Sequence, residues 1–181
     1  MKSFKQFLSE VFSDAEMKVA NATSRAKGAV GAKALVPRYV RQLASPDHKI
    51  LDFGAGRHAA HASSLRDDGY HVTAHEFGSN QDEKLHDPKA LSRKYDTVYA
   101  SNVLNTQSSR EMMGHTLDQI RHATKKGGQF IGNFPMSPRK AEDIDHEYLH
   151  DELAKRFKNV RRIGGTKKAP VFHAYDDKED K

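Results

Sequence analysis

The chain has 181 residues, lacks cysteine and tryptophan, and carries a formal net charge of +6 from 30 Lys and Arg against 24 Asp and Glu. This length suffices for one domain with a single core, and the missing cysteines exclude disulfide scaffolds, thiolate zinc sites and cysteine nucleophiles. An apolar run of about 18 residues is absent, as is a secretory signal, so we expect an intracellular, cytoplasmic protein without a membrane partner. The basic balance is compatible with an anionic partner such as nucleic acid.

Residues 1–33 differ in composition from the rest of the chain and are predicted to form an amphipathic helix followed by a basic arm. The helix is indicated by apolar residues at helical spacing: Phe4, Phe7, Leu8, Val11 and Phe12. The first ten residues resemble the capsid-targeting peptides of internal head proteins in large tailed phages, with Leu8-Ser9-Glu10 as the processing site. The resemblance implies a phage origin and packaging in the virion; the alternative is a first helix that simply packs on the domain.

Residues 34–175 alternate short apolar runs with helical stretches, which is typical of a mainly parallel sheet with helices on its faces. Strands are predicted at 48–53, 71–76, 95–101, 128–133, 158–163 and 170–175, with a seventh short strand or extended segment ending at Asp87. Helices are predicted at 34–44, 57–68, 107–125 and 139–157. The charged tail, 176–181, is predicted to be disordered.

The strongest motif is a glycine pair between the first strand and the following helix. Asp52-Phe53-Gly54-Ala55-Gly56 follows an apolar run, and the next strand ends in Glu76, 24 residues after Asp52. Glycine lets the chain turn sharply and lets a ligand approach backbone N–H groups at a helix N-terminus. A carboxylate at the neighbouring strand tip can accept both hydroxyls of a ribose. Together these features predict a nucleoside site.

These residues resemble the class I S-adenosylmethionine-dependent methyltransferases. The resemblance implies an α/β, Rossmann-like, seven-stranded and mostly parallel sheet with helices on both faces and an antiparallel last strand. It implies S-adenosylmethionine as cofactor, its methionine end held by Asp52, Gly54 and Gly56 and its ribose by Glu76. By the same resemblance Asp87 reaches the adenine edge, and Phe77 and Ser101 complete the cofactor site. His58 stands where many members have a third glycine.

The methyl acceptor stays open in the sequence. The loop after the third predicted strand, Ser101-Asn102-Val103-Leu104-Asn105, lacks the two prolines and the aromatic residue of base-amino methyltransferases, and no cysteine is present to attack a pyrimidine. Methyl transfer depends chiefly on alignment, so Asn102 and Asn105 are the predicted catalytic positioners, with His86 as a further candidate base. The alternative is that Ser101 and Asn102 cap the following helix. The acceptor is either a small molecule or a nucleic acid held by a basic surface.

Two other patterns compete with this interpretation. His146-Glu147-Tyr148-Leu149-His150 matches a zinc-protease motif, but charged neighbours and the missing third ligand favour packing histidines, and we predict no metal site. The stretch 155–168 holds seven basic residues and no acid, so it forms either a phosphate-binding stripe or a solvated helix end. Two alternative functions also stay open: a phage protein that binds or degrades S-adenosylmethionine, and a packaged nucleic-acid-binding protein. The oligomeric state is not predicted.

Overall fold

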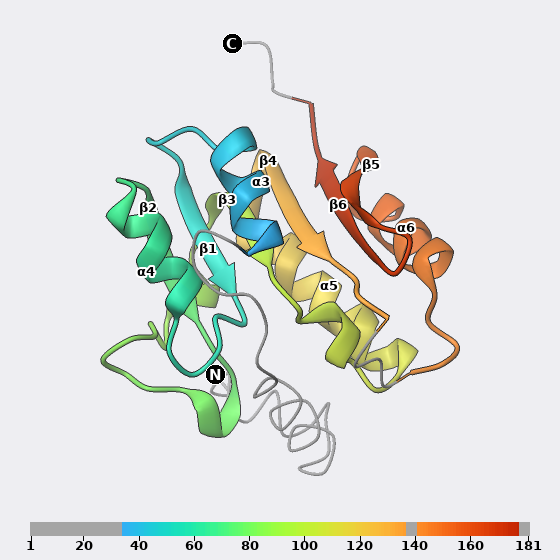
Figure 1. Ribbon diagram of the computed structural model, residues 1–181, viewed down its shortest axis with the longest axis horizontal. Helices are drawn as coiled ribbons and strands as arrows, with labels where there is room; N and C mark the ends of the chain where they lie inside the picture. Colours follow the sequence, from blue (N-terminus) through green and yellow to red (C-terminus); the bar gives the residue numbers. More distant parts are fainter. Residues whose placement is uncertain (1–33, 137–140, 178–181) are drawn as a thin grey trace.

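The computed structural model describes residues 34–136 and 141–177, which form one mixed sheet with the strand order β2-β1-β3-β4-β6-β5 (Figure 1). The strands are β1 Lys49–Phe53, β2 His71–His75, β3 Tyr95–Ala100, β4 Thr124–Asn133, β5 Asn159–Thr166 and β6 Ala169–Tyr175. The helices are α3 Leu35–Leu43, α4 Ala60–Asp67, α5 Arg110–Ala123 and α6 His146–Ala154. Three short 3₁₀ turns join them: η2 Gly78–Asn80, η3 Ala90–Ser92 and η4 Leu104–Thr106. The predicted α/β architecture is confirmed.

The four strands β2, β1, β3 and β4 run parallel, and the last strand is antiparallel, as predicted. In β1, Ile50 lies opposite Val72 on one side and Thr97 on the other. Strand β6 returns beside β4, with Val171 opposite Asn133. The carboxyl ends of β1, β2, β3 and β4 therefore share one border of the sheet, which we call the carboxyl edge. In Figure 1 the arrowheads of β1 and β4 point toward it.

Within the described residues the sheet has six strands, so the prediction of a seven-stranded sheet is wrong. The segment 81–87, where the extra strand was expected, turns back on itself because the N–H groups of Leu85 and His86 both donate to the Asp82 carbonyl, at 3.0 and 2.8 Å. These local bonds consume the backbone groups that a strand would have offered to β2.

Strand β2 consequently ends the sheet on one side, and nearby groups occupy its outward carbonyls. The Asp87 N–H donates to the Ala74 carbonyl at 2.9 Å. The Arg66 Nε, from α4, donates to the Val72 carbonyl at 2.9 Å. A side chain and a loop backbone thus take the place of a seventh strand at these two positions.

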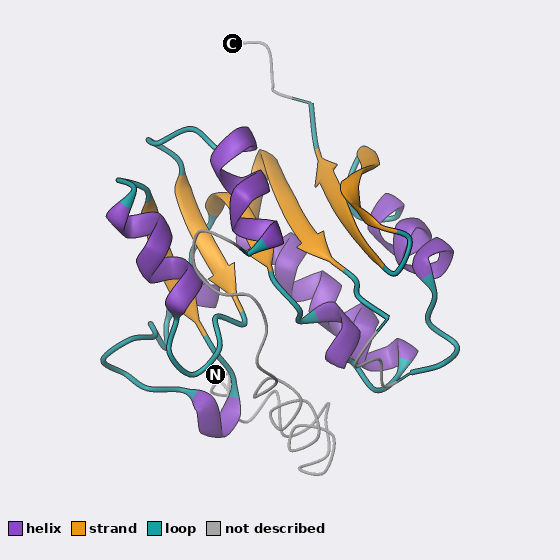
Figure 2. Ribbon diagram, in the orientation of Figure 1, coloured by secondary structure: helices purple, strands orange, loops and turns teal. Residues whose placement is uncertain are grey.

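Two hydrophobic clusters flank the sheet because successive strand residues face opposite sides. Helices α3 and α4 lie on one face of the sheet and α5 and α6 on the other (Figure 2). Ile50 belongs to the cluster beside α3 and α4, whereas Leu51 belongs to the cluster beside α5 and α6. The first cluster is built from Val36, Val40, Ile50, Ala62, Leu65, Val72, Ala74, Tyr99, Ile131 and Val171. The second includes Leu51, Phe53, Val98, Met113, Leu117, Ile120, Phe130, Leu149, Leu153 and Phe157. The predicted placement of helices on both faces is confirmed.

The helices start later than their apolar pattern predicts. Helix α4 begins after Ala59, whose φ of 45° is left-handed and interrupts the helix expected from 57. Helix α5 begins after Ser109, whose hydroxyl accepts the Met112 N–H at 3.1 Å, and α6 begins after Asp145, which caps its first turn. Polar capping side chains therefore mark the starts of α5 and α6, and a left-handed backbone residue marks the start of α4.

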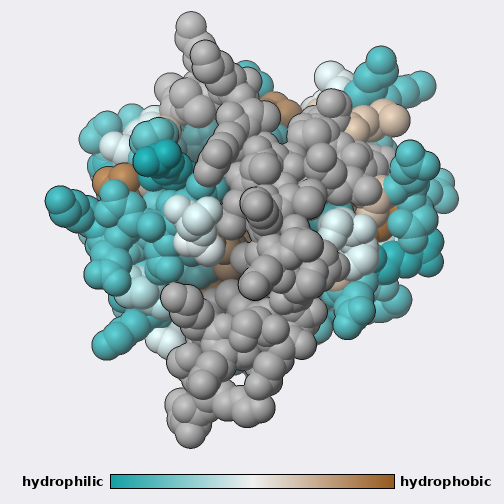
Figure 3. All heavy atoms as spheres, turned by 90° about the horizontal axis from the view of Figure 1, so that it is seen from below, coloured by the Kyte–Doolittle hydropathy of each residue, from teal (hydrophilic) through white to brown (hydrophobic). Residues whose placement is uncertain are grey.

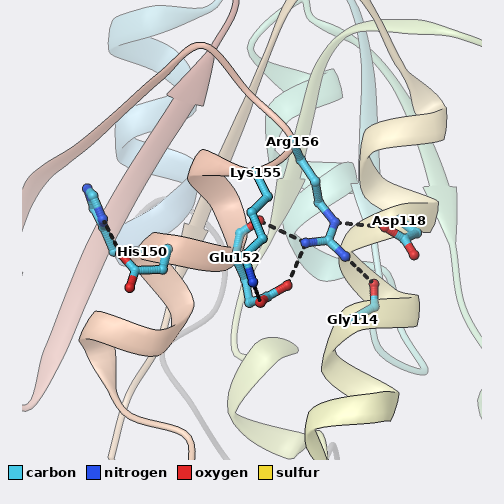
Figure 4. A network of polar contacts seen from close by, with 7 residues as sticks. Gly114, Asp118, His150, Glu152, Lys155 and Arg156 are labelled. Atoms are coloured by element: carbon cyan, nitrogen blue, oxygen red, sulfur yellow. Dashed lines mark hydrogen bonds and ion pairs between the residues drawn. The ribbon is translucent and has the colours of Figure 1, made fainter.

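Arg156, just beyond α6, joins that helix to α5 (Figure 4). Its Nε donates to Asp118 Oδ1 at 2.7 Å, its Nη1 to Glu152 Oε2 at 2.7 Å and its Nη2 to the Gly114 carbonyl at 3.2 Å. Lys155 also pairs with Glu152. We call these five residues the α5–α6 clamp.

Some predicted features lie outside the described residues: the amphipathic helix and basic arm of residues 1–33, including Leu8-Ser9-Glu10, and the end of the tail. They stay predictions. The first tail residues are described, and Asp176 is held by Arg121 at 2.9 Å and accepts the Lys158 N–H at 3.3 Å. These two contacts hold Asp176 against the domain.

Candidate functional site

The glycine turn at the end of β1 lies against two neighbouring strands. The N–H groups of Gly54 and Ala55 both donate to the His75 carbonyl of β2, at 3.0 and 2.8 Å. Gly54 and Gly56 have φ angles of 76° and 73°, in the left-handed region that glycine enters at little cost. A Cβ on Gly54 would lie 2.6 Å from Val103 Cγ2 in the loop after β3. The missing side chain lets three strand ends converge here.

Glu76, directly after β2, is bonded to this turn. Its Oε2 accepts the Gly56 N–H at 2.5 Å and its Oε1 accepts the Phe77 N–H at 2.7 Å. Burial raises the pKa of the Glu76 carboxyl, and the two backbone N–H groups oppose that rise. The Phe77 ring packs edge-on against Phe53 and His75, with centroid distances of 5.2 and 4.4 Å, and so fixes the chain that carries Glu76.

Asp52 lies behind the turn with 1% of its surface exposed. Burial raises the pKa of its carboxyl to about 7; the Tyr99 hydroxyl lowers it, and the negative charge of Glu76 raises it further. Among the described residues, no hydrogen-bond partner reaches Asp52 Oδ2. A buried carboxyl oxygen without a partner is costly, which makes Asp52 a candidate for ligand or water contact.

His86 connects the turn to the loop that replaces the seventh strand. Its Nδ1 accepts the Asp82 N–H at 2.9 Å, so its Nε2 carries the proton and donates to the Gly56 carbonyl, also at 2.9 Å. The ring is 2% exposed, and both nitrogens are engaged. This geometry favours a positioning role for His86 over the predicted role as a base.

Asp87, expected at the adenine edge, follows this loop and is half-buried. Its Oδ1 accepts the Lys89 N–H at 2.8 Å, and its Oδ2 pairs with Arg93. A ligand donor would therefore share these oxygens, which have lone pairs to spare.

The loop after β3 separates the two predicted catalytic residues. Asn102 is exposed, with a left-handed φ of 59°, whereas Asn105 is 1% exposed within η4. Asn133, at the end of β4, accepts the Asn102 N–H at 2.7 Å and donates to Asn102 Oδ1 at 2.8 Å. Ser101 is partly exposed beside Asn102, and Ser109 instead of either residue caps α5.

Asn133 is the functional candidate that sequence reasoning missed. Its two bonds fix the amide plane of Asn102, and no described residue accepts the Nδ2 hydrogens of Asn102, which can therefore be donated to a ligand. The available signal was a polar residue that ends an apolar strand, Phe130-Ile131-Gly132-Asn133. Strand tips at one sheet edge meet in space, so this signal places Asn133 near the loop after β3.

The histidines of the other sequence patterns, His58, His146 and His150, do not form a cluster at the carboxyl edge. The His58 side chain is exposed. His146 contacts the Phe134 ring edge-on at 5.8 Å, and exposed His150 lies 3.4 Å from Asp151. In residues 34–136 and 141–177, no group of three or more His, Asp or Glu could hold a metal ion. No helix in these ranges is long and apolar enough to cross a membrane.

The polar groups around the glycine turn fit a ligand that carries neighbouring hydroxyls and a polar chain. Each Glu76 carboxylate oxygen accepts one backbone N–H, so the remaining lone pairs of both oxygens can accept hydrogen bonds from ligand hydroxyls. Apart from Gly56 itself and its two neighbours in the chain, no described residue has an atom within 4 Å of the position that a Gly56 Cβ would take, so a ligand can approach that backbone closely. With the unpartnered Asp52 oxygen beside them, these residues suit a nucleoside with a charged extension, such as S-adenosylmethionine.

Comparison with known proteins agrees with this geometry. A family model described as a methyltransferase domain matches residues 24–163. No curated protein sequence matches the chain.

Solved structures of methyltransferases share the fold. The magnesium protoporphyrin IX methyltransferase of Synechocystis PCC 6803, with bound SAM, is 12% identical, has a TM-score of 0.58, and aligns over 98% of this chain and 87% of its own. A SAM-dependent methyltransferase from Bacteroides fragilis in complex with S-adenosyl-L-homocysteine is 17% identical, with a TM-score of 0.60 over 90% and 96%. A glycopeptide N-methyltransferase complexed with SAM is 16% identical, with a TM-score of 0.57 over 84% and 99%.

Proposed function

The chain belongs to the methyltransferase domain family, and from this premise we propose that it transfers a methyl group from S-adenosylmethionine to an acceptor at the carboxyl edge of the sheet. One observation carries the proposal. The buried Glu76 carboxylate is bonded to the Gly56 N–H at 2.5 Å, which joins the tip of β2 to the glycine turn. This contact brings a hydroxyl acceptor and an open backbone surface together at one point.

The cofactor site combines the residues already described at this edge. Glu76 accepts ribose hydroxyls, the Gly54 and Gly56 backbone borders the methionine end, and Asp52 supplies its unpartnered oxygen to that end or to a bridging water. We assign Asp87 to the adenine edge, with Phe77 and Ser101 lining the site. Solved methyltransferase structures with this fold have SAM or S-adenosyl-L-homocysteine bound, which supports the choice of cofactor.

When bound, S-adenosylmethionine supplies a methyl group on a positively charged sulfur: an acceptor lone pair forms the new bond to carbon, the electron pair of the broken bond stays on sulfur, and the acceptor proton leaves to solvent. The chain's own contribution is alignment. Asn102 offers its Nδ2 hydrogens to the acceptor, while Asn133 holds its amide plane. We assign buried Asn105 to the support of this loop, behind Asn102.

Calorimetric titration with S-adenosylmethionine and S-adenosylhomocysteine tests the cofactor site. We expect micromolar binding by the intact protein and a loss of about 100-fold in Glu76→Ala, because two hydrogen bonds to a charged group disappear. Glu142→Ala, at an exposed glutamate before α6, is the matched control and should bind normally.

Thermal unfolding of each variant shows whether Glu76→Ala remains folded. A folded Glu76→Ala protein with intact affinity would overturn the assignment. Consumption of the cofactor without a methylated product, in the presence of candidate acceptors, would instead favour a protein that degrades S-adenosylmethionine.

A further inference from the structure

The strands β5 and β6 form a hairpin whose sequence is strongly basic. Residues 153–175 contain seven Lys and Arg and no Asp or Glu. Four of the seven lie on β5 or in the turn after it and are exposed: Arg161, Arg162, Lys167 and Lys168. We call these four residues the basic hairpin.

The charges of the basic hairpin are available to a partner. The other basic residues of the stretch have acidic partners: Lys155 and Arg156 belong to the α5–α6 clamp, and Lys158 lies 3.6 Å from Asp177. No acid of the described residues forms an ion pair with the basic hairpin. Arg161 lies over the Tyr175 ring, 4.9 Å from its centroid, and Arg162 donates to the Thr166 carbonyl at 2.7 Å. Both arginines are thus held in place while their charge stays uncompensated.

The turn of the hairpin lies at the carboxyl edge, beside the proposed acceptor site. Val171 of β6 is opposite Asn133 of β4, whose amide is bonded to Asn102. Lys168 is three residues before Val171, which at about 3.3 Å per residue places it roughly 10 Å beyond the end of β4. The Met136 N–H donates to the Lys168 carbonyl at 2.7 Å, so the chain leaving β4 stays alongside the turn.

The neighbourhood of the turn suits a long polyanion better than a small one. Arg161 and Lys167 are six residues apart, which at about 3.3 Å per residue separates them by about 20 Å, whereas duplex DNA repeats one phosphate per strand about every 3.4 Å. Seen from below, the surface visible on the side of β5 and β6 is mostly hydrophilic (Figure 3). Met136, 52% exposed beside the turn, adds an apolar contact for a base.

We propose that the basic hairpin binds the phosphate backbone of a nucleic acid and thereby presents one of its nucleotides to Asn102 as the methyl acceptor. This inference rests on the proposed function for the transfer step. The binding step depends on the hairpin alone.

Fluorescence anisotropy with labelled 20-nucleotide DNA and RNA tests the binding step across a salt series. Lys167→Gln/Lys168→Gln removes two charges from the hairpin, and Lys49→Gln/Lys89→Gln removes two exposed charges elsewhere. Each lost phosphate contact should lower the slope of log affinity against log salt by about 0.7 for single strands, so we expect a fall of about 1.4 in the hairpin variant and none in the control. A labelled mononucleotide should show no such difference.

Two further measurements separate this inference from the proposed function. Calorimetry with S-adenosylhomocysteine should give equal affinity in both variants, and tritium transfer from methyl-labelled cofactor to the better-bound nucleic acid should fall at least tenfold in the hairpin variant. Normal cofactor binding with equal nucleic-acid affinity in both variants would overturn the inference and leave the proposed function intact. The intact protein could instead fail to bind the cofactor and still bind nucleic acid through the hairpin. That result would overturn the proposed function and support the binding of nucleic acid by the basic hairpin.

If the hairpin charges serve instead to keep an edge strand soluble, the hairpin variant will self-associate in sedimentation experiments while its remaining monomer binds nucleic acid normally. That result would also overturn the inference.

Discussion

Two buried glutamates, in two regions of the molecule, meet opposite surroundings. Glu76, in the glycine-turn region, is 6% exposed and bonded to backbone N–H groups, and burial raises its pKa. Glu152, in the α5–α6 clamp, is 9% exposed and bonded to Lys155 and Arg156, which hold its pKa below the usual range. The charged form of the carboxyl group is thus disfavoured at Glu76 and stabilised at Glu152.

The difference separates a binding region from a supporting region. A carboxylate buried without a cation is retained where it has a further task, since burial alone disfavours its charge. A carboxylate between two cations completes a structural contact. The comparison therefore predicts that ligand binding is sensitive near Glu76 and that folding stability is sensitive near Glu152.

The largest expected effect is that of Gly54→Ala in the glycine-turn region. The new Cβ would lie 2.6 Å from Val103 Cγ2, at a φ of 76°. Steric overlap and the left-handed backbone together should lower the free energy of unfolding by about 2 to 5 kcal/mol, measured by urea denaturation. Adding Val103→Ala should restore the steric part, and a Gly54→Ala protein of normal stability would contradict the described turn.

Arg156→Ala should produce the next largest loss, now in the α5–α6 clamp. The change leaves Glu152 buried with one cation fewer and removes the bonds to Asp118 and the Gly114 carbonyl. We expect a loss of about 2 to 4 kcal/mol in urea denaturation and unchanged cofactor affinity.

Arg110→Ala is the control for the clamp. Arg110 and Asp143 are 56% and 63% exposed, so the loss there should stay below about 1 kcal/mol. Equal losses in both variants would show that burial of Glu152 does not matter.

The dependence of stability on pH should differ in sign between the two regions. The pKa of Asp52 is raised to about 7, so the folded protein binds this proton more tightly than the unfolded chain, and stability falls as pH rises from about 4 to 7. From pH 5 to pH 7 the loss is about 2 kcal/mol. Glu152, with its lowered pKa, contributes stability above its unfolded pKa that is lost as pH falls through the folded value.

Urea denaturation at pH 5 and pH 7 measures the first of these effects. Asp52→Asn should reduce the fall in stability between the two pH values, leaving the part that comes from Glu76. If the variant keeps the full slope of the unmodified protein, Asp52 is not the group that titrates.

The smallest effect is expected from Gly114→Ala, a glycine within α5. A Cβ there would lie 3.9 Å from Arg156 Nη2, which is ordinary contact. Alanine should therefore stabilise the helix by up to about 1 kcal/mol, read from the urea midpoint. A loss of stability would show that the α5–α6 clamp packs more tightly than described.

The sequence predicts the sheet well because its strands are apolar runs, and it predicts that Glu76 lies in one site with the glycine turn because adjacent parallel strand tips must meet. The sequence analysis does not predict the starts of elements that depend on side-chain caps, nor the contacts that depend on the path of a loop. Strand β4 starts at Thr124, four residues before the predicted start, and the apolar pattern misses this start because the first residues of the strand are polar. Helix α6 starts at His146, where the side chain of Asp145 caps its first turn.

The same limits explain the outcome at the candidate site. The positions of Gly56 and Glu76 follow from strand order, whereas the bonds of His86 to Gly56 and of Asn133 to Asn102 depend on how two loops fold back. The hydrophobic periodicity of a sequence does not indicate where a loop folds back onto the sheet. Polar residues that end apolar strands carry the remaining usable signal.

The free side of β2 has a practical consequence for the protein in concentrated solution. An exposed strand normally offers its carbonyls to the strands of other molecules and so seeds aggregation. Here the guanidinium of Arg66 and the backbone of Asp87 already occupy the Val72 and Ala74 carbonyls. Because these two carbonyls already accept hydrogen bonds, a strand of a neighbouring molecule cannot pair with β2 at these positions. One side chain and one turn thus protect this edge of the sheet from intermolecular strand pairing.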